Sequence, residues 1–236
     1  MNPFTGTVTD WHPALNDAVR TVATGYFRNA PGGPVSLVAV GGEFDAFGGV
    51  ARRNLAAINL ETGAVLPWRP APDGVVRALH ARAGMLYAGG DFTHIDQQAR
   101  RHLAAFSLGS RQLASWNPDA DGPVHALASL AVPAPTENVS TTPGSRLPTP
   151  DAIVTIYAGG DFDTIGGLAR SKVAAISAAS GAATPWAPAG GKQFTTLGGA
   201  AASHLVRLNT TTGAADAGWN PAPDGEVRAI QVGRGS

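Results

Sequence analysis

Hydrophobic and small residues recur along this chain in a cassette that occurs four times. Each cassette opens with an apolar run that ends in Gly-Gly, and the full form continues with an acidic residue and Phe, as in LYAGGDF at 86–92. A second apolar run follows, as in HLAAFS at 102–107. Repetition at a spacing of about 50 residues predicts an array of equivalent structural units. The first runs are VAVGGEF at 38–44, LYAGGDF at 86–92, IYAGGDF at 156–162 and a degenerate GGKQF at 190–194, and the second runs are NLAAIN at 54–59, HLAAFS at 102–107, KVAAIS at 172–177 and HLVRLN at 204–209.

Each cassette predicts short strands and no helix. In the most regular copy, β-prone runs cover 76–79, 85–92, 103–107 and 113–117, with a turn near Gly84 and a polar connection over 93–101. The run at 85–92 is apolar on both faces, which is typical of a strand covered on both sides. Asp-Gly pairs at 73–74, 121–122 and 224–225 predict turns in which glycine takes a positive φ. Four short strands per repeat indicate the blade of a β-propeller.

We therefore expect an all-β propeller of four-stranded antiparallel blades, with four blades' worth of strands that form an incomplete ring or part of a longer chain. Two Pro-, Gly- and Ser/Thr-rich insertions, TGYFRNAPGGP and SLAVPAPTENVSTTPGSRLPTPD, fall between the first and second strands of their blades. Insertions at one topological place emerge on one face, either as a binding face or as surface loops that tolerate drift. The expected division is a partial blade 1–18, blade 19–75, blade 76–123, a blade with a long insertion 124–189, a degenerate blade 190–225 and the start of a next blade at 226–236.

Every tryptophan of the chain stands in a Trp-x-Pro motif near the end of a cassette. We expect these indoles to pack between adjacent blades, where each N–H needs a hydrogen-bond acceptor. The Ala-Ala pair of each intact second run would let neighbouring sheets approach closely. The five blade-packing residues are Trp11, Trp68, Trp116, Trp186 and Trp219.

The acidic residue after each intact Gly-Gly precedes an arginine by nine positions. If the two positions end and begin neighbouring antiparallel strands, the side chains meet and can form a bidentate ion pair. We predict one structural ion pair in each intact blade. A ring of carboxylates that binds a metal ion is the alternative, and it requires several oxygens to converge. The predicted pairs are Glu43–Arg52, Asp91–Arg100 and Asp161–Arg170.

Composition narrows the function classes. The 17 basic and 17 acidic residues balance, so no basic surface for nucleic acid is expected. No apolar run is long enough to span a bilayer, and no signal peptide is visible at the N-terminus. The absence of cysteine excludes disulfides and thiolate chemistry.

Candidate chemistry is sparse. The six histidines (12, 80, 94, 102, 125 and 204) have no metal-ligand spacing, and no nucleophile elbow, phosphate loop or dinucleotide motif occurs. Gly-Gly-Asp-Phe has the spelling of a nucleotide-cyclase signature, but here it recurs inside β cassettes. We therefore predict no catalytic residue, no metal ligand and no cofactor, and the ligand-binding residues stay undefined.

The cassette YAGGDFTHIDQQARRHLAAFSLGSRQLASWNPDADGPVHALA resembles the delta-60 type β-propeller repeat, a relative of the kelch and quinoprotein-like propeller repeats. The resemblance extends over most of residues 9–231 and departs from the pattern at 188–194 and in the insertion at 129–151. It implies a bacterial, often secreted or surface-associated protein, commonly one module of a longer chain, with no established catalytic activity.

A weaker similarity connects residues 57–68 to the tryptophan-docking repeat of quinoprotein dehydrogenases (Ala-x-Asp-x-x-Thr-Gly, then Trp). It implies a blade-packing role for these residues, without the vicinal disulfide or a calcium-ligand set. Three functions follow as hypotheses: a non-catalytic binding or surface-display module for a protein or glycan, a quinone-dependent (PQQ-type) dehydrogenase-like propeller, and a structural spacer. Loops on one face or the central channel would hold the ligand.

Overall fold

The computed structural model describes residues 14–27, 35–132 and 153–188, together with 196–197, 200–201, 208–209, 212, 214–216 and 218. All regular secondary structure in these residues is β-strand, so the predicted all-β class is confirmed. Three successive repeats each form a three-stranded antiparallel sheet, which we number 1 to 3 along the chain. Sheet 1 contains β1 (Val19–Phe27), β2 (Val35–Gly42) and β5 (Leu55–Asn59); sheet 2 contains β6 (Val76–Arg82), β7 (Met85–Gly90) and β10 (Leu103–Ser107); sheet 3 contains β11 (Val124–Val132), β12 (Ile153–Gly160) and β15 (Val173–Ser177).

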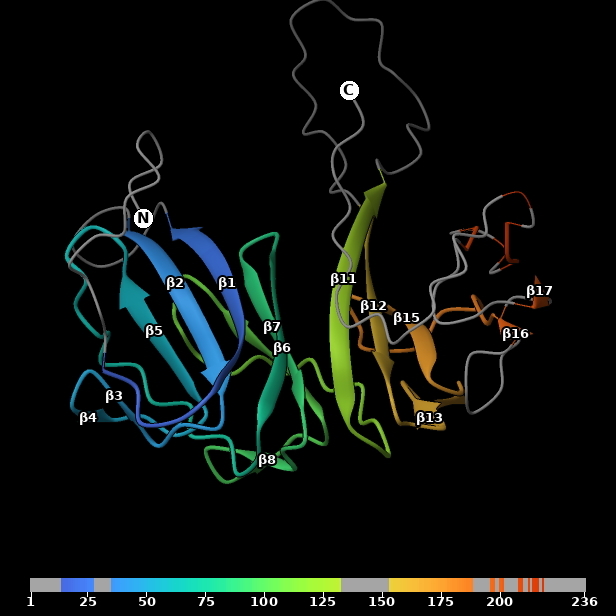
Figure 1. The fold of residues 1–236 in the computed structure, drawn as a ribbon. Coiled ribbons are helices and arrows are strands. Elements are labelled where there is room, and N and C mark those ends of the chain that lie inside the picture. The colour runs from blue at the N-terminus through green and yellow to red at the C-terminus, as the bar shows by residue number, and fades with distance from the viewer. Residues whose placement is uncertain are drawn as a thin grey trace, which may run out of the picture.

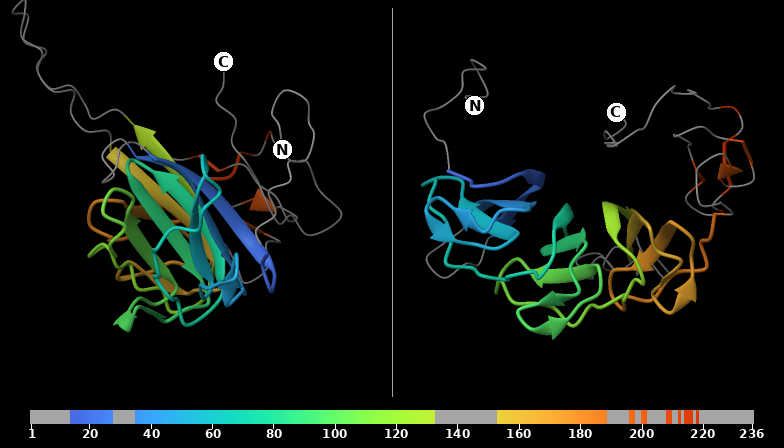
Figure 2. Two further views of the ribbon diagram at one scale, coloured as in Figure 1. Left: turned by 90° about the vertical axis from the view of Figure 1, so that its left-hand side faces the viewer. Right: turned by 60° about the horizontal axis from the view of Figure 1, so that its bottom comes forward.

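The three sheets stand side by side along an arc, with their first strands adjacent (Figures 1 and 2). β1 contacts β6, and β6 contacts β11. Side chains alternate between the two faces of a strand. In β7, Leu86 and Ala88 therefore lie in the core between sheets 1 and 2, and Tyr87 lies in the core between sheets 2 and 3. The central sheet is buried on both faces, which explains its continuous apolar runs.

Close approach explains the repeated Gly-Gly. A Cβ on Gly89 would lie 2.7 Å from Val124 Cγ1 in the next repeat, and a Cβ on Gly90 would collide with the carbonyl oxygen of Val75 in its own repeat. Gly41 and Gly42 have the equivalent neighbours in repeat 1. The first glycine thus lets adjacent sheets touch, and the second lets the first and second strands of one sheet pair.

The prediction of a fourth strand in each repeat, at 113–117 in the most regular copy, is wrong. After each third strand the chain makes a single-residue bridge to it and then leaves the sheet. The Trp-x-Pro motif follows three residues later, where a proline without an N–H cannot extend a ladder. Each of sheets 1 to 3 therefore has three strands and a bridge. The bridges are Ile58–Val65, Phe106–Leu113 and Ile176–Ala183.

The connection over 93–101, expected as a polar loop, contains a two-stranded hairpin. Its turn residues Asp96 and Gln97 have φ values of 45° and 63°, so both occupy the left-handed region that a two-residue type I′ turn requires. Equivalent hairpins occur in the other repeats. They are β3 (Ala46–Phe47) with β4 (Val50–Ala51), β8 (His94–Ile95) with β9 (Gln98–Ala99), β13 (Thr164–Ile165) with β14 (Leu168–Ala169), and β16 (Thr196–Leu197) with β17 (Ala200–Ala201).

Two further expectations change, and part of a third lies outside the described residues. The first residues of both insertions extend strands, because β1 and β2 pair as far as Phe27↔Val35 and β11 and β12 pair as far as Val132↔Ile153. Gly74 has no positive φ; it is needed because a Cβ there would lie 2.8 Å from the backbone nitrogen of Phe92. Partial blade 1–18 (apart from residues 14–18), most of the degenerate blade 190–225 and the blade start at 226–236 lie outside the described residues.

Candidate functional site

The tryptophans within the described residues connect successive repeats. Trp116 Nε1 donates a hydrogen bond to the carbonyl oxygen of Ser177 at 3.0 Å, and Trp186 Nε1 donates to that of Asn209 at 3.0 Å. Trp68 packs edge-on against Phe106 of repeat 2, with ring centroids 5.0 Å apart. These three indoles have the inter-repeat position expected from the sequence, whereas Trp11 and Trp219 lie outside the described residues.

The predicted ion pairs are not the ones in the structure. Each acidic residue pairs with the first strand of its own repeat. Asp91 accepts from Arg77 Nε and Nη2, both at 2.6 Å, in a bidentate pair. The equivalent partners are Arg20 for Glu43, at 2.7 Å from Nε, and His125 for Asp161, at 2.8 Å.

A β-bulge explains this pairing. The register of the first strand shifts between Val76 and Ala78, so Arg77 is an extra residue opposite the end of β7. A bulge redirects the side chain of the extra residue, here toward the acid after Gly-Gly. Arg20 and His125 occupy the same extra position in β1 and β11. The sequence does contain a signal for this pairing that the prediction missed. A basic residue follows the first valine of each first strand: Arg20, Arg77 or His125.

The three arginines nine residues after the acids bind backbone carbonyls instead. Arg52 is 4% exposed and donates from Nη1 to Ala51 and from Nη2 to Leu66, both at 2.8 Å. Arg100 and Arg170 make the same two bonds, one to the preceding residue and one to the segment after the third strand. Burial, with a smaller effect of the charge on Arg69, lowers the pKa of Arg52. These guanidinium groups therefore attach each hairpin to the outer edge of its sheet.

A polar residue before each first strand fixes the same hairpin from the other side. Asp73 Oδ1 accepts from the backbone nitrogens of Thr93 and His94, at 2.7 and 2.9 Å, and its Oδ2 accepts from the Thr93 hydroxyl at 2.8 Å. Burial raises the pKa of Asp73, but the combined hydrogen bonds from His94 and Thr93 outweigh it and lower the pKa. Asp121 in repeat 3 and Asn16 in repeat 1 accept the equivalent backbone bonds.

We call Arg20–Glu43, Arg77–Asp91 and His125–Asp161 the bulge pairs. They form a row of ionisable side chains at the ends of neighbouring strands. The hydrogen bond with Asp91 raises the pKa of Arg77, and burial opposes it. The charges of Asp91 and, from the adjacent repeats, of Glu43 and Asp161 add to the rise. The hydrogen bond from His125 lowers the pKa of Asp161, with burial opposing it. The row combines acidic and basic side chains, and each acid has its own hydrogen-bonding partner on the first strand of its repeat.

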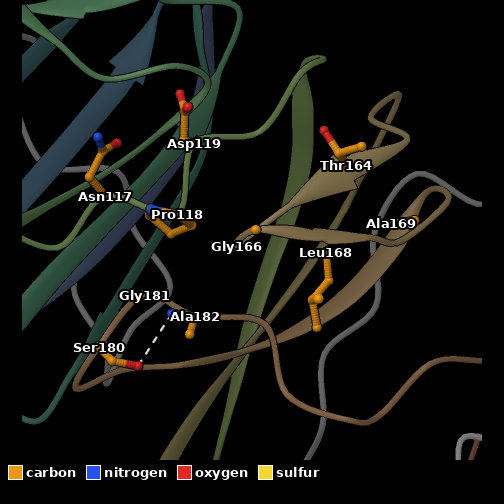
Figure 3. Close-up of a pocket in the computed structure, with 11 residues that line it drawn as sticks. Asn117, Pro118, Asp119, Thr164, Gly166, Leu168, Ala169, Ser180, Gly181 and Ala182 are labelled. Carbon is orange, nitrogen blue, oxygen red and sulfur yellow. Dashed lines mark hydrogen bonds between the residues drawn. The ribbon is translucent and has the colours of Figure 1, made fainter.

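A cleft of about 600 Å³ opens on the outer side of the junction between repeats 2 and 3 (Figure 3). Three segments surround it: the linker after Trp116, the β13–β14 hairpin and the turn after β15. Gly181 has φ +78°, in the left-handed region that favours glycine, and this conformation places the turn against the linker at Asn117. The lining residues are Asn117, Pro118, Asp119, Thr164, Gly166, Gly167, Leu168, Ala169, Ser180, Gly181 and Ala182.

The cleft presents hydrogen-bonding groups beside apolar surface. Asn117 supplies an amide, Asp119 a carboxylate, and Thr164 and Ser180 hydroxyl groups, while the side chain of Leu168 is 44% exposed. The Asp119 carboxylate is itself only 3.8 Å from Arg101 Nε in an exposed ion pair. Sequence reasoning missed this site, because its residues come from a linker and two turns that are separated by about 50 residues.

No group of three His, Asp or Glu side chains within the described part of the chain is placed to hold a metal ion. That part also contains no helix of the length and apolar character needed to cross a membrane. The fold and the site together define an all-β array of stacked antiparallel sheets with an open polar cleft at one inter-repeat junction. No protein-family model, curated protein or solved structure matches the chain.

Proposed function

We propose that the chain is a non-catalytic module of the β-propeller type that binds a glycan in the cleft between repeats 2 and 3. Support for the propeller comes from the arc of stacked sheets, from adjacent first strands and from indoles that bridge successive repeats. The delta-60 resemblance supports an exported or surface-associated protein with further blades or domains. The blades would then act as a rigid support for the ligand site.

The cleft is the observation that supports a glycan as the ligand. Its volume of about 600 Å³ lies in the range of about 300–1,000 Å³ that suits small ligands. Sugars present many hydroxyl groups and small apolar C–H faces. The amide of Asn117 and the carboxylate of Asp119 can exchange hydrogen bonds with such hydroxyls, and Leu168 can pack against a C–H face. The Thr164 hydroxyl bonds the Asp121 carboxylate and can accept one further bond. The site lies on the tightly packed junction of two sheets, so little ordering is needed on binding.

A glycan-array screen with the full chain, followed by calorimetric titration of the best binder, tests the proposal. Asn117→Ala should weaken binding about tenfold, because one hydrogen bond contributes roughly 1 kcal/mol or more. Leu168→Ala should also weaken binding. Arg69→Ala is the matched control, since Arg69 stands at the equivalent Trp-x-Pro position of repeat 1 and lies outside the cleft.

Two results would contradict the proposal. One is a screen in which no glycan binds above background, which would favour the structural-spacer function. The other is a bound glycan whose affinity Asn117→Ala and Leu168→Ala leave unchanged, which would place the glycan site elsewhere.

A further inference from the structure

The face of sheet 3 that points away from sheet 2 is only partly covered. Ile156, Ala158 and Ile176 point toward sheet 2 and lie in the shared core, so the alternate residues point away from it. Among these, Tyr157 and Gly159 are partly exposed. We call the surface formed by Thr155, Tyr157, Gly159, Val173 and Ala175 the far face of sheet 3.

The same positions in sheet 2 are closed. Tyr87 is 2% exposed, and Gly89 and Leu103 are buried. The difference lies in the neighbouring first strand. In repeat 2 that neighbour is β11, whose Val124 lies over Gly89, whereas the nearest described atoms to a Cβ on Gly159 belong to its own repeat, at 3.8 Å or more.

Among the described residues, only the outer half of this junction has a covering side chain. Trp186, at 8% exposure, packs edge-on against Tyr157 with ring centroids 5.3 Å apart and covers the outer half. After Trp186-Ala187-Pro188 the sequence passes directly to GGKQF at 190–194, without a counterpart of the first strand that follows Trp68 and Trp116. The degenerate repeat thus lacks a first strand, which would cover this area, together with the apolar half of its second strand.

One other segment of the chain has the sequence of that element. Residues 227–230 read Val-Arg-Ala-Ile, beside Val-Arg-Ala-Leu at 76–79 and Val-His-Ala-Leu at 124–127. Pro-Asp-Gly precedes it at 223–225, as Pro-Asp-Gly precedes the first strand of repeat 2 at 72–74. Both of its counterparts place their valine over the first glycine of the preceding repeat. We propose that residues 227–230 bind the far face of sheet 3 as a replacement first strand, with Val227 over Gly159.

Charge at the strand end agrees with this occupant. In the closed junctions Arg77 lies near Glu43 of the preceding repeat as well as its own Asp91. Arg228 would take the position of Arg77, and the acid of the preceding repeat would then be Asp161. Asp161 already interacts with His125, Lys172 and Arg77, but its side chain is 69% exposed, against 33% for Glu43 and 29% for Asp91, which leaves room for a further cationic neighbour.

Disulfide trapping in the full chain tests the inference, because the chain contains no cysteine. In the closed junctions an added Cβ on the first glycine lies 3.0 to 3.2 Å from the valine Cβ, close to the separation of about 3.5–4.5 Å found in disulfides. Gly159→Cys with Val227→Cys should therefore form a disulfide within one chain under mild oxidation. Peptide mass spectrometry and non-reducing electrophoresis identify the link, and its rate should not depend on protein concentration.

Two variants calibrate this measurement. Gly89→Cys with Val124→Cys reports a junction that is closed in the structure and should form the same kind of link. Gly159→Cys with Glu226→Cys moves the second cysteine by one residue, to the opposite side of a strand, and should form the link far more slowly.

The remaining outcomes overturn the inference. No 159–227 link under conditions that form the 89–124 link would exclude residues 227–230 as the occupant. A 159–227 link between two chains would assign the occupant to a second copy instead. A rapid link between chains with Gly159→Cys and Val19→Cys would replace it with the exposed β1 of a second copy. The glycan cleft involves none of these residues, so this test and the binding screen can fail independently.

Discussion

Repeats 2 and 3 have the same strands, the same bulge and the same tryptophan–tyrosine contact, but their outward faces differ in burial. The rings of Tyr87 and Trp116 lie 5.1 Å apart and both are buried, because β11 and β15 of repeat 3 cover them. The rings of Tyr157 and Trp186 lie 5.3 Å apart, yet Tyr157 stays partly exposed. The local contact within a repeat thus forms in both cases, while full burial depends on the first strand of the next repeat. Stability in this array comes from pairs of repeats, as expected for a stacked architecture.

Removal of the two indoles gives the largest expected effect and tests this comparison directly. Trp116→Ala should lower the free energy of unfolding by about 3–5 kcal/mol, because it opens a cavity in a closed junction and removes one of the two hydrogen bonds that the Ser177 carbonyl accepts, the other coming from Gly181 N. Trp186→Ala should cost less, since Tyr157, which it packs against, is already partly exposed. Urea denaturation followed by circular dichroism measures both. Equal losses would show that the two junctions contribute alike.

Loss of one of the hairpin-attaching arginines, the partly buried Arg100, comes next. Arg100→Leu removes two charge-assisted hydrogen bonds to the carbonyls of Ala99 and Ala114, so it should cost about 1.5–3 kcal/mol. Arg100→Lys should recover only part of this, because one ammonium cannot span two carbonyls as the planar guanidinium does. Denaturant midpoints of the two variants give the comparison.

Double-mutant cycles on Asp91 provide the control. Asp91→Ala should couple with Arg77→Ala by about 0.5–1 kcal/mol, the range for a partly exposed pair, and should be additive with Arg100→Leu. Coupling of Asp91 to Arg100 instead would restore the pairing that the sequence suggested.

Hairpin turns differ between these repeats as well. Gly166 and Gly167 form the turn in repeat 3, whereas repeat 2 places Asp96 and Gln97 at φ values of 45° and 63°. A left-handed conformation costs a non-glycine residue roughly 1–2 kcal/mol, partly offset by the greater backbone entropy that glycine loses on folding. Asp96→Gly with Gln97→Gly should therefore raise stability by about 1 kcal/mol.

Gly167→Ala is the reverse experiment. Its φ is +81° and a Cβ there would meet nothing within 4 Å, so a loss of about 1 kcal/mol would come from backbone conformation alone. Thermal unfolding measures both variants. A stabilising Gly167→Ala would show that these turns are not held in the left-handed region.

The sequence was sufficient for the parts of this fold that repeat with a clear period. Alternation and repetition predicted the strands that became β6, β7 and β10, and the restriction of tryptophan to one motif predicted its place between repeats. The exact register of the strand pairing could not be predicted from the sequence. Val76, Arg77 and Ala78 form a bulge rather than a regular ladder, and this single extra residue gave Asp91 a partner on the first strand instead of Arg100.

The cleft could not be predicted from the sequence, for a related reason. Its polar groups, Asn117, Asp119, Thr164 and Ser180, are unremarkable in their own segments. They come together only because a linker, a hairpin turn and a strand turn from two repeats meet, and the hairpin itself was expected as a loop. Distances between turns depend on backbone conformations such as φ +78° at Gly181, which residue identity permits but does not specify.

The residue that fixes each hairpin differs in charge between repeats. Of the variants proposed, one at this position should change stability least at neutral pH. Asp73 in repeat 2 has a lowered pKa, while Asn16 in repeat 1 accepts equivalent backbone bonds without a charge. A carboxyl whose pKa is lower in the folded state than its unfolded value of about 3.9 stabilises the fold above that value, and this contribution is lost as the pH falls below it. Stability should thus decline in acid, in part because Asp73 becomes protonated.

The variant Asp73→Asn isolates the contribution of Asp73 to this loss of stability in acid. The amide oxygen can still accept from the backbone nitrogens of Thr93 and His94, so stability at pH 7 should change by less than about 1 kcal/mol. The slope of stability against pH below about 4 should become shallower, because one carboxyl with a lowered pKa no longer takes up a proton on unfolding. Denaturation series from pH 2 to pH 7 on both proteins measure the two slopes. Identical slopes would mean that the hydrogen bonds to Asp73 do not favour its charged form, and the hairpin would then be fixed equally well by either residue at any pH.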